Sequence, residues 1–142
     1  MPNIQKVAIT SKSIIGYKIR TNNKNIPKIG ELWGKFISEV SPPFPHYGVY
    51  HHFESDNNGD YDILAGSEDE PHEPFDSVTI KEGRYLKFSA KGELHQAVQQ
   101  CWEQIWAYFE DPSIDERRAY ETDFEVYKSM DDVEVYIGVH YF

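Results

Sequence analysis

The chain has 142 residues, of which 39% are hydrophobic, 27% charged and 15% aromatic, and its formal net charge is −10. These values predict one folded, soluble domain rather than a disordered chain. A protein that binds nucleic-acid backbones needs a basic surface, so the acidic balance predicts no direct DNA binding. An acidic protein attracts cationic small molecules or basic partners, although acidic charge also serves solubility alone.

The sequence opens without a basic segment followed by an apolar run, and it holds no apolar stretch of membrane-spanning length. We therefore expect a cytoplasmic protein without membrane association. Cys101 is the single cysteine, which excludes an intramolecular disulfide. Because Cys101 shares a helical pattern with Ala97 and Trp102, we interpret it as a small buried hydrophobe.

The first half of the chain predicts strand, helix, strand, strand. The predicted elements are β-rich runs at 4–9 and 13–20, a helix from about 27 to 40, and strands at 47–53 and 61–65. Pro27 suits the first turn of the helix, and apolar residues follow it at helical spacing. A strong turn signal at 56–59 makes the last two strands a predicted hairpin.

The second half repeats this order after an acidic, proline-containing stretch at 66–75, which predicts a solvated loop. Its predicted elements are a strand at 78–89 interrupted at 82–83, a helix from about 93 to 109, and strands at 122–127 and 133–141. The chain therefore predicts a single domain over residues 1–142, made of one repeat at about 1–66 and another at about 76–142.

The two repeats differ at one informative position. Tyr-Gly-Val-Tyr at 47–50 aligns with Phe-Glu-Val-Tyr at 124–127, so Glu125 corresponds to Gly48. The helices align Trp33 with Trp106. The repeat predicts an α+β fold with antiparallel sheets and pseudo-twofold symmetry. We expect each helix to cover one sheet face of its own half, the opposite faces to meet with Glu125 on them, and a ligand groove to lie between the halves.

Several motifs in this order resemble the GyrI-like effector-binding domain family. The motifs are Ile26-Pro27, Glu31-Leu32-Trp33, Tyr47-Gly48-Val49-Tyr50, Gly59-Asp60-Tyr61, Gly83-Arg84-Tyr85, the helix around Trp102 to Trp106, and Asp123-Phe124-Glu125-Val126-Tyr127. The family supplies the drug-sensing domains of Rob-type AraC regulators and BmrR-type MerR regulators, and stand-alone forms are carried on mobile gene cassettes. The chain resembles such a stand-alone form. It departs from the regulators of the family in one respect, since it shows neither a recognition helix nor a basic patch, and we therefore expect no direct DNA binding.

The resemblance implies a pocket at the junction of two fused modules, in which Glu125 meets the positive charge of an amphiphilic, aromatic ligand. The residues expected to bind the ligand are Glu125, Trp33, Tyr50, Tyr85, Trp106 and Tyr127. Aromatic faces attract organic cations and tolerate varied shapes. Core packing for the tryptophans and ordinary surface positions for the tyrosines are the alternatives, and Glu134 is a second candidate acid on the next strand.

The sequence offers little for other chemistries. Adjacent His51 and His52 should point to opposite strand faces, so at most one of them joins His46, and we expect neither a metal nor a cofactor. No catalytic serine motif is present. Two further functions stay open: a hydrolase of reactive natural products that uses Glu125 as general acid or base, and a protein-interaction module of the kind that inhibits DNA gyrase.

Overall fold

The computed structural model describes residues 3–40, 43–55, 59–70 and 73–140. Within these ranges the chain forms eight strands and two helices. In order they are β1 (Asn3–Ile9), β2 (Lys12–Thr21), α1 (Ile26–Val40), β3 (His46–His51), β4 (Tyr61–Glu68), β5 (Asp76–Ile80), β6 (Gly83–Lys91), α2 (Leu94–Glu110), β7 (Arg117–Ser129) and β8 (Asp132–His140).

The order of elements agrees with the α+β prediction, and β3 and β4 pair as the expected antiparallel hairpin strands. Residues 56–58 of the predicted turn and residue 141 of the last predicted strand lie outside the described residues. Strand β7 begins at Arg117 rather than at residue 122. Its register against β8 shifts between Arg118 and Asp123, so a bulge breaks the alternation by which a strand is recognised in sequence.

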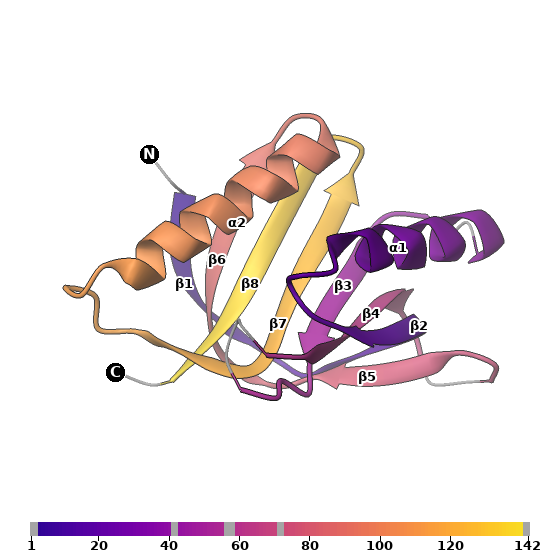
Figure 1. Ribbon diagram of the computed structural model, residues 1–142, viewed down its shortest axis with the longest axis horizontal. Helices are drawn as coiled ribbons and strands as arrows, with labels where there is room; N and C mark the ends of the chain where they lie inside the picture. The colour runs from indigo at the N-terminus through magenta and orange to yellow at the C-terminus, as the bar shows by residue number, and fades with distance from the viewer. Residues whose placement is uncertain (1–2, 41–42, 56–58, 71–72, 141–142) are drawn as a thin grey trace.

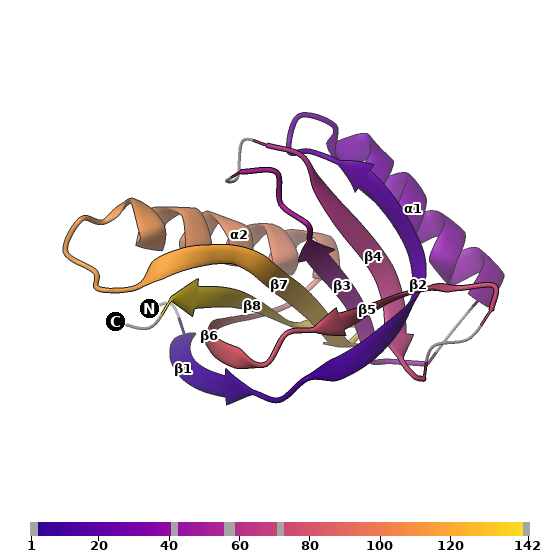
Figure 2. The ribbon, with the colours of Figure 1, turned by 90° about the horizontal axis from the view of Figure 1, so that it is seen from below.

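The strands form one antiparallel sheet in the order β1-β6-β8-β7-β3-β4-β2-β5. The order is symmetric about the β7–β3 pair, since β6, β8 and β7 on one side match β2, β4 and β3 on the other. The leading strands are exchanged between the halves: β1 precedes β2 in the chain but pairs with β6, and β5 precedes β6 but pairs with β2. Figure 2 shows both crossing connections from below.

Both helices lie on the same face of the sheet (Figure 1). Helix α2 packs on β6 and β8, and α1 packs on β2 and β4. A helix is about 10 Å wide, which is two strand spacings of about 4.8 Å. Each helix therefore covers the two strands next to the central pair, and the central strands β7 and β3 are left without a helix above them.

The apolar stripe of each helix explains its position. Leu32 and Phe36 of α1 are buried, as are Cys101 and Ile105 of α2. Glu93 caps α2 by accepting hydrogen bonds from the first free backbone N–H groups of the helix. Neither α1 nor α2 combines the length and apolar character that crossing a membrane requires.

The opposite face of the sheet curls onto itself and forms a core without a helix. All eight strands contribute to it, including Ile14 and Leu64 from the first half and Ile80 and Phe124 from the second. The expected meeting of the two halves through their opposite faces is thus present. This core is filled by side chains, and the cavity lies on the other side of the sheet.

Candidate functional site

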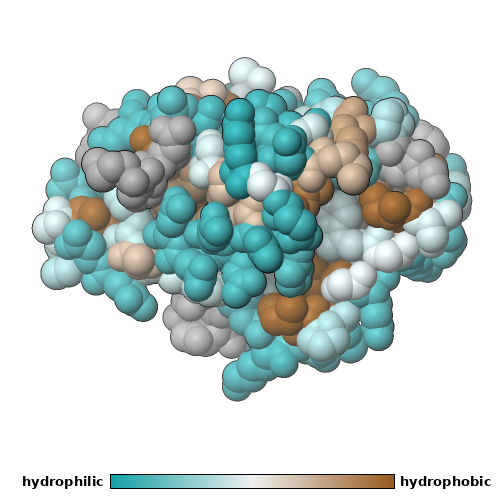
Figure 3. Space-filling model, turned by 90° about the horizontal axis from the view of Figure 1, so that it is seen from above, coloured by the Kyte–Doolittle hydropathy of each residue, from teal (hydrophilic) through white to brown (hydrophobic). Residues whose placement is uncertain are grey.

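A cavity of about 1120 Å³ lies over the central strands, between the two helices. Its walls come from α1 and α2, and its floor comes from β3 and β7. On the side of the molecule that carries the helices, hydrophobic residues are exposed among hydrophilic ones (Figure 3). Ile37 and Trp106, on facing helices, line the cavity and are each more than two-fifths exposed. The cavity is therefore open to solvent at its upper edge and apolar along its walls.

Glu125 lies in the floor of the cavity, and its side chain is buried. Three donors hold the carboxylate. The Tyr50 hydroxyl donates to Oε2 at 2.9 Å, Trp102 Nε1 donates to the same oxygen at 2.8 Å, and the Tyr127 hydroxyl donates to Oε1 at 2.9 Å. All three donors are uncharged, so the carboxylate is solvated by dipoles and not neutralised by them.

This environment shifts the titration of the site. Burial raises the pKa of Glu125, and the hydrogen bonds from Trp102, Tyr127 and Tyr50 offset only part of that effect. Burial and the neighbouring carboxylate raise the pKa of the Tyr50 and Tyr127 hydroxyls well above the ordinary value. Both hydroxyls thus remain donors, and the acid gains free energy from any positive charge that enters the cavity.

A second buried acid on the same strand shows the contrast. Asp123 stands two residues before Glu125 on the same face of β7 and also lines the cavity. Its Oδ2 accepts a hydrogen bond from Arg118 Nη2 at 2.8 Å, and its Oδ1 accepts one from the Gly138 N–H at 2.9 Å. Asp123 is therefore already paired with a cation of the protein, whereas the three groups that hold Glu125 carry no charge.

Gly48 makes room for this arrangement. It pairs directly with Glu125 across β3 and β7. A Cβ at Gly48 would lie 2.9 Å from Glu125 Oε1 and 2.9 Å from Trp33 Cζ2, which is closer than real Cβ contacts. The absence of a side chain at position 48 lets the acid and the indole ring lie side by side.

Two tryptophan–tyrosine pairs flank the acid in a symmetric way. Trp33 of α1 meets Tyr127 with ring centroids 5.2 Å apart at 77°, and Trp102 of α2 meets Tyr50 at 5.6 Å and 75°. The structural counterpart of Trp33 is thus Trp102. The sequence alignment of Trp33 with Trp106 was wrong by one helical turn, because the buried stripes of the helices align Leu32 with Cys101.

Five of the six residues expected to bind a ligand line this cavity: Glu125, Trp33, Tyr50, Trp106 and Tyr127. The sixth, Tyr85, does not. Its ring lies in the core on the opposite face, 5.4 Å from the ring of Phe124, and its hydroxyl donates to the Lys81 carbonyl oxygen. The sequence prediction of three tyrosines around one acid was therefore wrong in one member.

The expected side of the sheet was also wrong. Glu125 lies on the face that carries the helices and contacts Trp102 of α2. The apolar residues Phe124 and Val126 face the opposite core. Glu134 lies on the face away from the cavity, where Tyr136 donates to it and Lys87 is ion-paired with it, so it is not a second acid of the site.

Trp102, Asp123 and Arg118 are site residues that the sequence reasoning missed. Trp102 was assigned to helix packing because it recurs at helical spacing with Cys101. Aligning the two helices by their buried residues, instead of by their leucine–tryptophan and isoleucine–tryptophan pairs, places Trp102 opposite Trp33. The Arg118–Asp123 pair bridges the bulge in β7, and no periodic pattern marks such a contact.

The chain resembles known proteins over nearly its full length. A family model described as Cass2, integron-associated effector binding protein, matches residues 7–139. An integron cassette protein from the mobile metagenome of Vibrio cholerae is 34% identical, with a TM-score of 0.87 over 96% of this chain and 95% of that one. A search of curated proteins finds no match to the chain.

Two more distant structures share the fold. SAV2435 bound to tetraphenylphosphonium is 16% identical, with a TM-score of 0.75 over 97% of this chain and 94% of that one. A protein from Staphylococcus aureus MU50, described as a candidate bacterial transcription regulation protein, is 18% identical, with a TM-score of 0.74 over 99% of both chains. At these identities the likeness establishes the fold alone.

Proposed function

The chain belongs to the Cass2 family of integron-associated effector-binding proteins, and we propose that it is a binding module for amphiphilic aromatic cations. The observation that carries the proposal is the carboxylate of Glu125, buried in the floor of an aromatic cavity and held by three uncharged donors. The module releases its ligand unchanged.

The electrostatics favour a cation. A buried carboxylate that lacks a counter-charge costs free energy, and a cation bound nearby recovers much of that cost. The field around Glu125 is supported by a net charge of −10 on the whole chain. Asp123 adds little, because Arg118 already neutralises it.

The shape of the site favours an aromatic ligand of drug size. A volume of about 1120 Å³ is at the upper end of common small-molecule sites, which run to about 1,000 Å³. Trp33, Trp102 and Trp106 line this volume, and aromatic rings attract cations as well as flat apolar groups. SAV2435, which shares the fold, is bound to tetraphenylphosphonium, a lipophilic cation of this kind.

The experiment compares two ions of the same shape and opposite charge. Isothermal titration calorimetry measures the affinity of tetraphenylphosphonium and of tetraphenylborate for the wild-type protein and for Glu125→Gln. We expect the phosphonium to bind the wild type much more tightly than the borate. Glu125→Gln should weaken the phosphonium by roughly 1.5–3 kcal/mol, the scale of a charge-assisted contact, while the borate binds as well or better.

The comparison between the ions separates charge from packing. Equal losses for both ions in Glu125→Gln would mean that the residue supports the shape of the cavity and does not meet the charge. Equal affinities of the wild type for both ions would contradict the preference for cations. Glu134→Gln is the matched control, because Glu134 lies on the opposite face with its own lysine partners; it should leave both affinities unchanged.

The raised pKa of Glu125 also suits a general acid or base, so hydrolysis is the second candidate function. Mass spectrometry of a ligand after long incubation with the protein distinguishes the two. Recovery of the unchanged ligand supports binding alone. A product whose appearance depends on Glu125 would make the protein a hydrolase.

A further inference from the structure

A second polar cluster lies on the face of the sheet away from the cavity, at the end of β3 and the start of β4. His51 and Asp62 are paired across these strands. Val49 and Leu64, two residues from them along their strands, belong to the core of that face, so alternation places His51 and Asp62 there too. The cluster is therefore separate from the ligand cavity.

His52 joins this cluster because the strand ends at His51. The backbone of His52 has φ of 51°, a left-handed conformation that is uncommon for residues other than glycine. Strand alternation had predicted that the His52 ring would point to the face opposite His51, and this prediction was wrong. The ring centroids of His51 and His52 lie 4.6 Å apart, and His52 Nδ1 lies 2.7 Å from Asp62 Oδ2.

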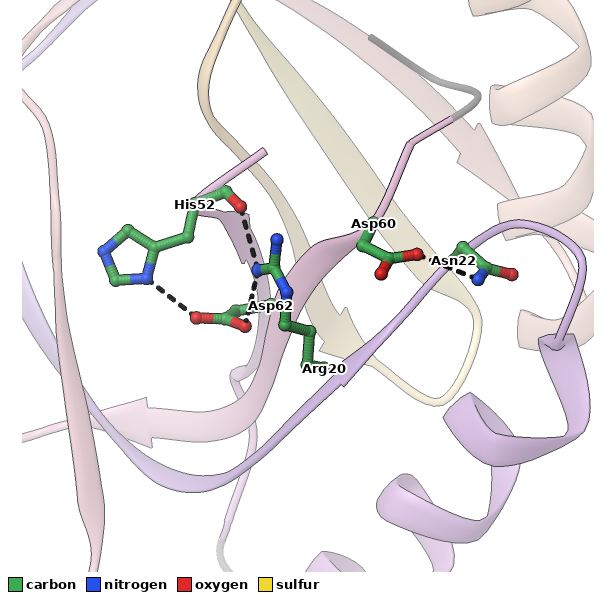
Figure 4. Close-up of polar contacts among 5 residues, drawn as sticks. All are labelled: Arg20, Asn22, His52, Asp60 and Asp62. Atoms are coloured by element: carbon green, nitrogen blue, oxygen red, sulfur yellow. Dashed lines mark hydrogen bonds and ion pairs between the residues drawn. The ribbon is translucent and has the colours of Figure 1, made fainter. Parts of the chain in front are cut away.

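The carboxylate at the centre of the cluster is held in place by Arg20. Arg20 Nη1 donates to Asp62 Oδ1 at 3.1 Å and to the His52 carbonyl oxygen at 3.0 Å (Figure 4). One oxygen of Asp62 is thus occupied by the arginine, and the other faces the histidine rings. Such a support from a neighbouring residue is what orients a carboxylate ligand in metal sites.

His51 contributes a buried nitrogen without a hydrogen-bond partner among the described residues. Its side chain is buried, and its Nε2 has no hydrogen-bond partner in the described part of the chain. Leaving a buried polar group unpaired costs about 1–3 kcal/mol. A metal ion bound at this nitrogen would supply the missing partner.

We propose that His51, His52 and Asp62 bind a divalent transition-metal ion of the zinc type. One ligand atom from each residue lies within 4.8 Å of the others. A tetrahedral ion with bonds of about 2.1 Å needs these atoms about 3.4 Å apart, so small side-chain rotations complete the site. Two nitrogens and one oxygen suit Zn²⁺, Ni²⁺ or Cu²⁺, whereas Mg²⁺ and Ca²⁺ prefer oxygen ligands. Arg20 places a positive charge beside Asp62, which lowers the expected affinity of the site for a cation.

The test titrates Zn²⁺ into tag-free, chelator-treated protein by isothermal titration calorimetry. We expect one ion per chain. The exposed His52 can be truncated without opening the core, so His52→Ala should lower the affinity at least about tenfold, as loss of a ligand does. Asp62→Asn should do the same. His140→Ala removes an exposed histidine from β8 and is the matched control; it should bind zinc like the wild type.

Two further measurements keep the proposal open to refutation. Mg²⁺ at the same concentrations should give no saturable heat, and zinc affinity should be unchanged in Glu125→Gln, which alters only the cavity. Absence of saturable zinc binding to the wild type would overturn the proposal. Zinc binding to His52→Ala with wild-type affinity would overturn it equally, and so would equal binding of Mg²⁺.

Discussion

The two halves of the sheet meet at β3 and β7, and they are alike in scaffold but different in charge. Each half places a tyrosine on the cavity floor and a tryptophan on the wall, giving the pairs Trp33–Tyr127 and Trp102–Tyr50. At the centre, one half supplies Glu125 and the other supplies Gly48. A symmetric frame thus builds an asymmetric site. A second acid at position 48 would repel the first, and any side chain there would displace Trp33.

The largest expected effect is a loss of stability when a buried residue is truncated in either half, and it tests whether the two halves unfold together. Phe36 of α1 and Ile105 of α2 are both buried. Phe36→Ala should lower the free energy of unfolding by about 3–5 kcal/mol and Ile105→Ala by about 2–5 kcal/mol, since each leaves a cavity in the core. Because β1 and β5 are exchanged between the halves, either change should shift one common unfolding transition.

Calorimetry and circular dichroism during thermal unfolding check this prediction. Ile37→Ala, at an exposed position of α1, should change stability by no more than about 0.5 kcal/mol. Two separate transitions in either core variant would mean that the halves are independent units.

Gly48→Ala tests the space that the difference between the halves requires. The new methyl group would press on Glu125 Oε1 and Trp33 Cζ2, so we expect a loss of about 1–3 kcal/mol in stability, the usual cost of overpacking. The affinity for tetraphenylphosphonium should fall as well. Gly34→Ala is the control, because a Cβ at this helical glycine meets nothing within 4 Å; it should stabilise the protein by roughly 0.5–1 kcal/mol.

Varying the pH tests the charge of Glu125. Cation binding needs the carboxylate, so the affinity for tetraphenylphosphonium should fall by up to about tenfold per pH unit as the pH drops below the raised pKa of Glu125. The contribution of Glu125 to the stability of the folded protein should depend on pH in the opposite direction, falling as the pH rises. Below the unfolded-state pKa of about 4.3, Glu125 is protonated in both states. As the pH rises through the folded-state pKa, the wild type should lose stability relative to Glu125→Gln.

Titration calorimetry and denaturant unfolding over a pH series measure the two quantities. An affinity for the phosphonium that stays constant through the acidic range would contradict a titrating acid at the site. Tetraphenylborate supplies the control, because its affinity should not fall on acidification.

The smallest expected effect is a difference in the pKa of Glu125 between variants of Trp102 and Trp33. Trp102 Nε1 donates to Glu125, so Trp102→Phe removes one of three donors and should raise the pKa of Glu125 further. Trp33→Phe keeps all three donors and should leave that pKa near the wild-type value. The pH midpoint of phosphonium binding reports the difference, and equal midpoints in the two variants would contradict the role given to the Trp102 hydrogen bond.

The sequence contained most of the elements and the identity of the acid. Helical spacing and strand alternation are local signals, so α1, α2 and the hairpin of β3 and β4 could be predicted from them. The repeat motif around Gly48 and Glu125 pointed to the centre of the site, because duplicated strands meet at a symmetry axis. Where the two motifs differ, symmetry no longer explains the residue, and the proposed binding of a cation supplies a reason for it.

The rest depended on long-range packing. Phe124 and Val126 looked like residues that a helix covers. Each helix covers only two of the eight described strands, however, and Phe124 and Val126 face the core on the opposite side of the sheet. Tyr85 stands in an alternating strand pattern like those of Tyr50 and Tyr127. It belongs to β6, however, and its side chain lies in the core on the opposite face of the sheet. Pairing of β1 with β6 joins residues that are distant in sequence. Strand propensity and the spacing of apolar residues are local signals, so they do not predict which strands pair.

The exchanged strands also restrict how the width of the cavity can change. A hinge between the halves would open the cavity, as domain closure does in many binding proteins. Here β1 of the first half is paired along its length with β6, and β5 of the second half with β2. A hinge motion would have to break both ladders at once. The sheet therefore fixes the width of the cavity. The cavity can adjust to a ligand only through rotamer changes of the tryptophans and tyrosines that line it.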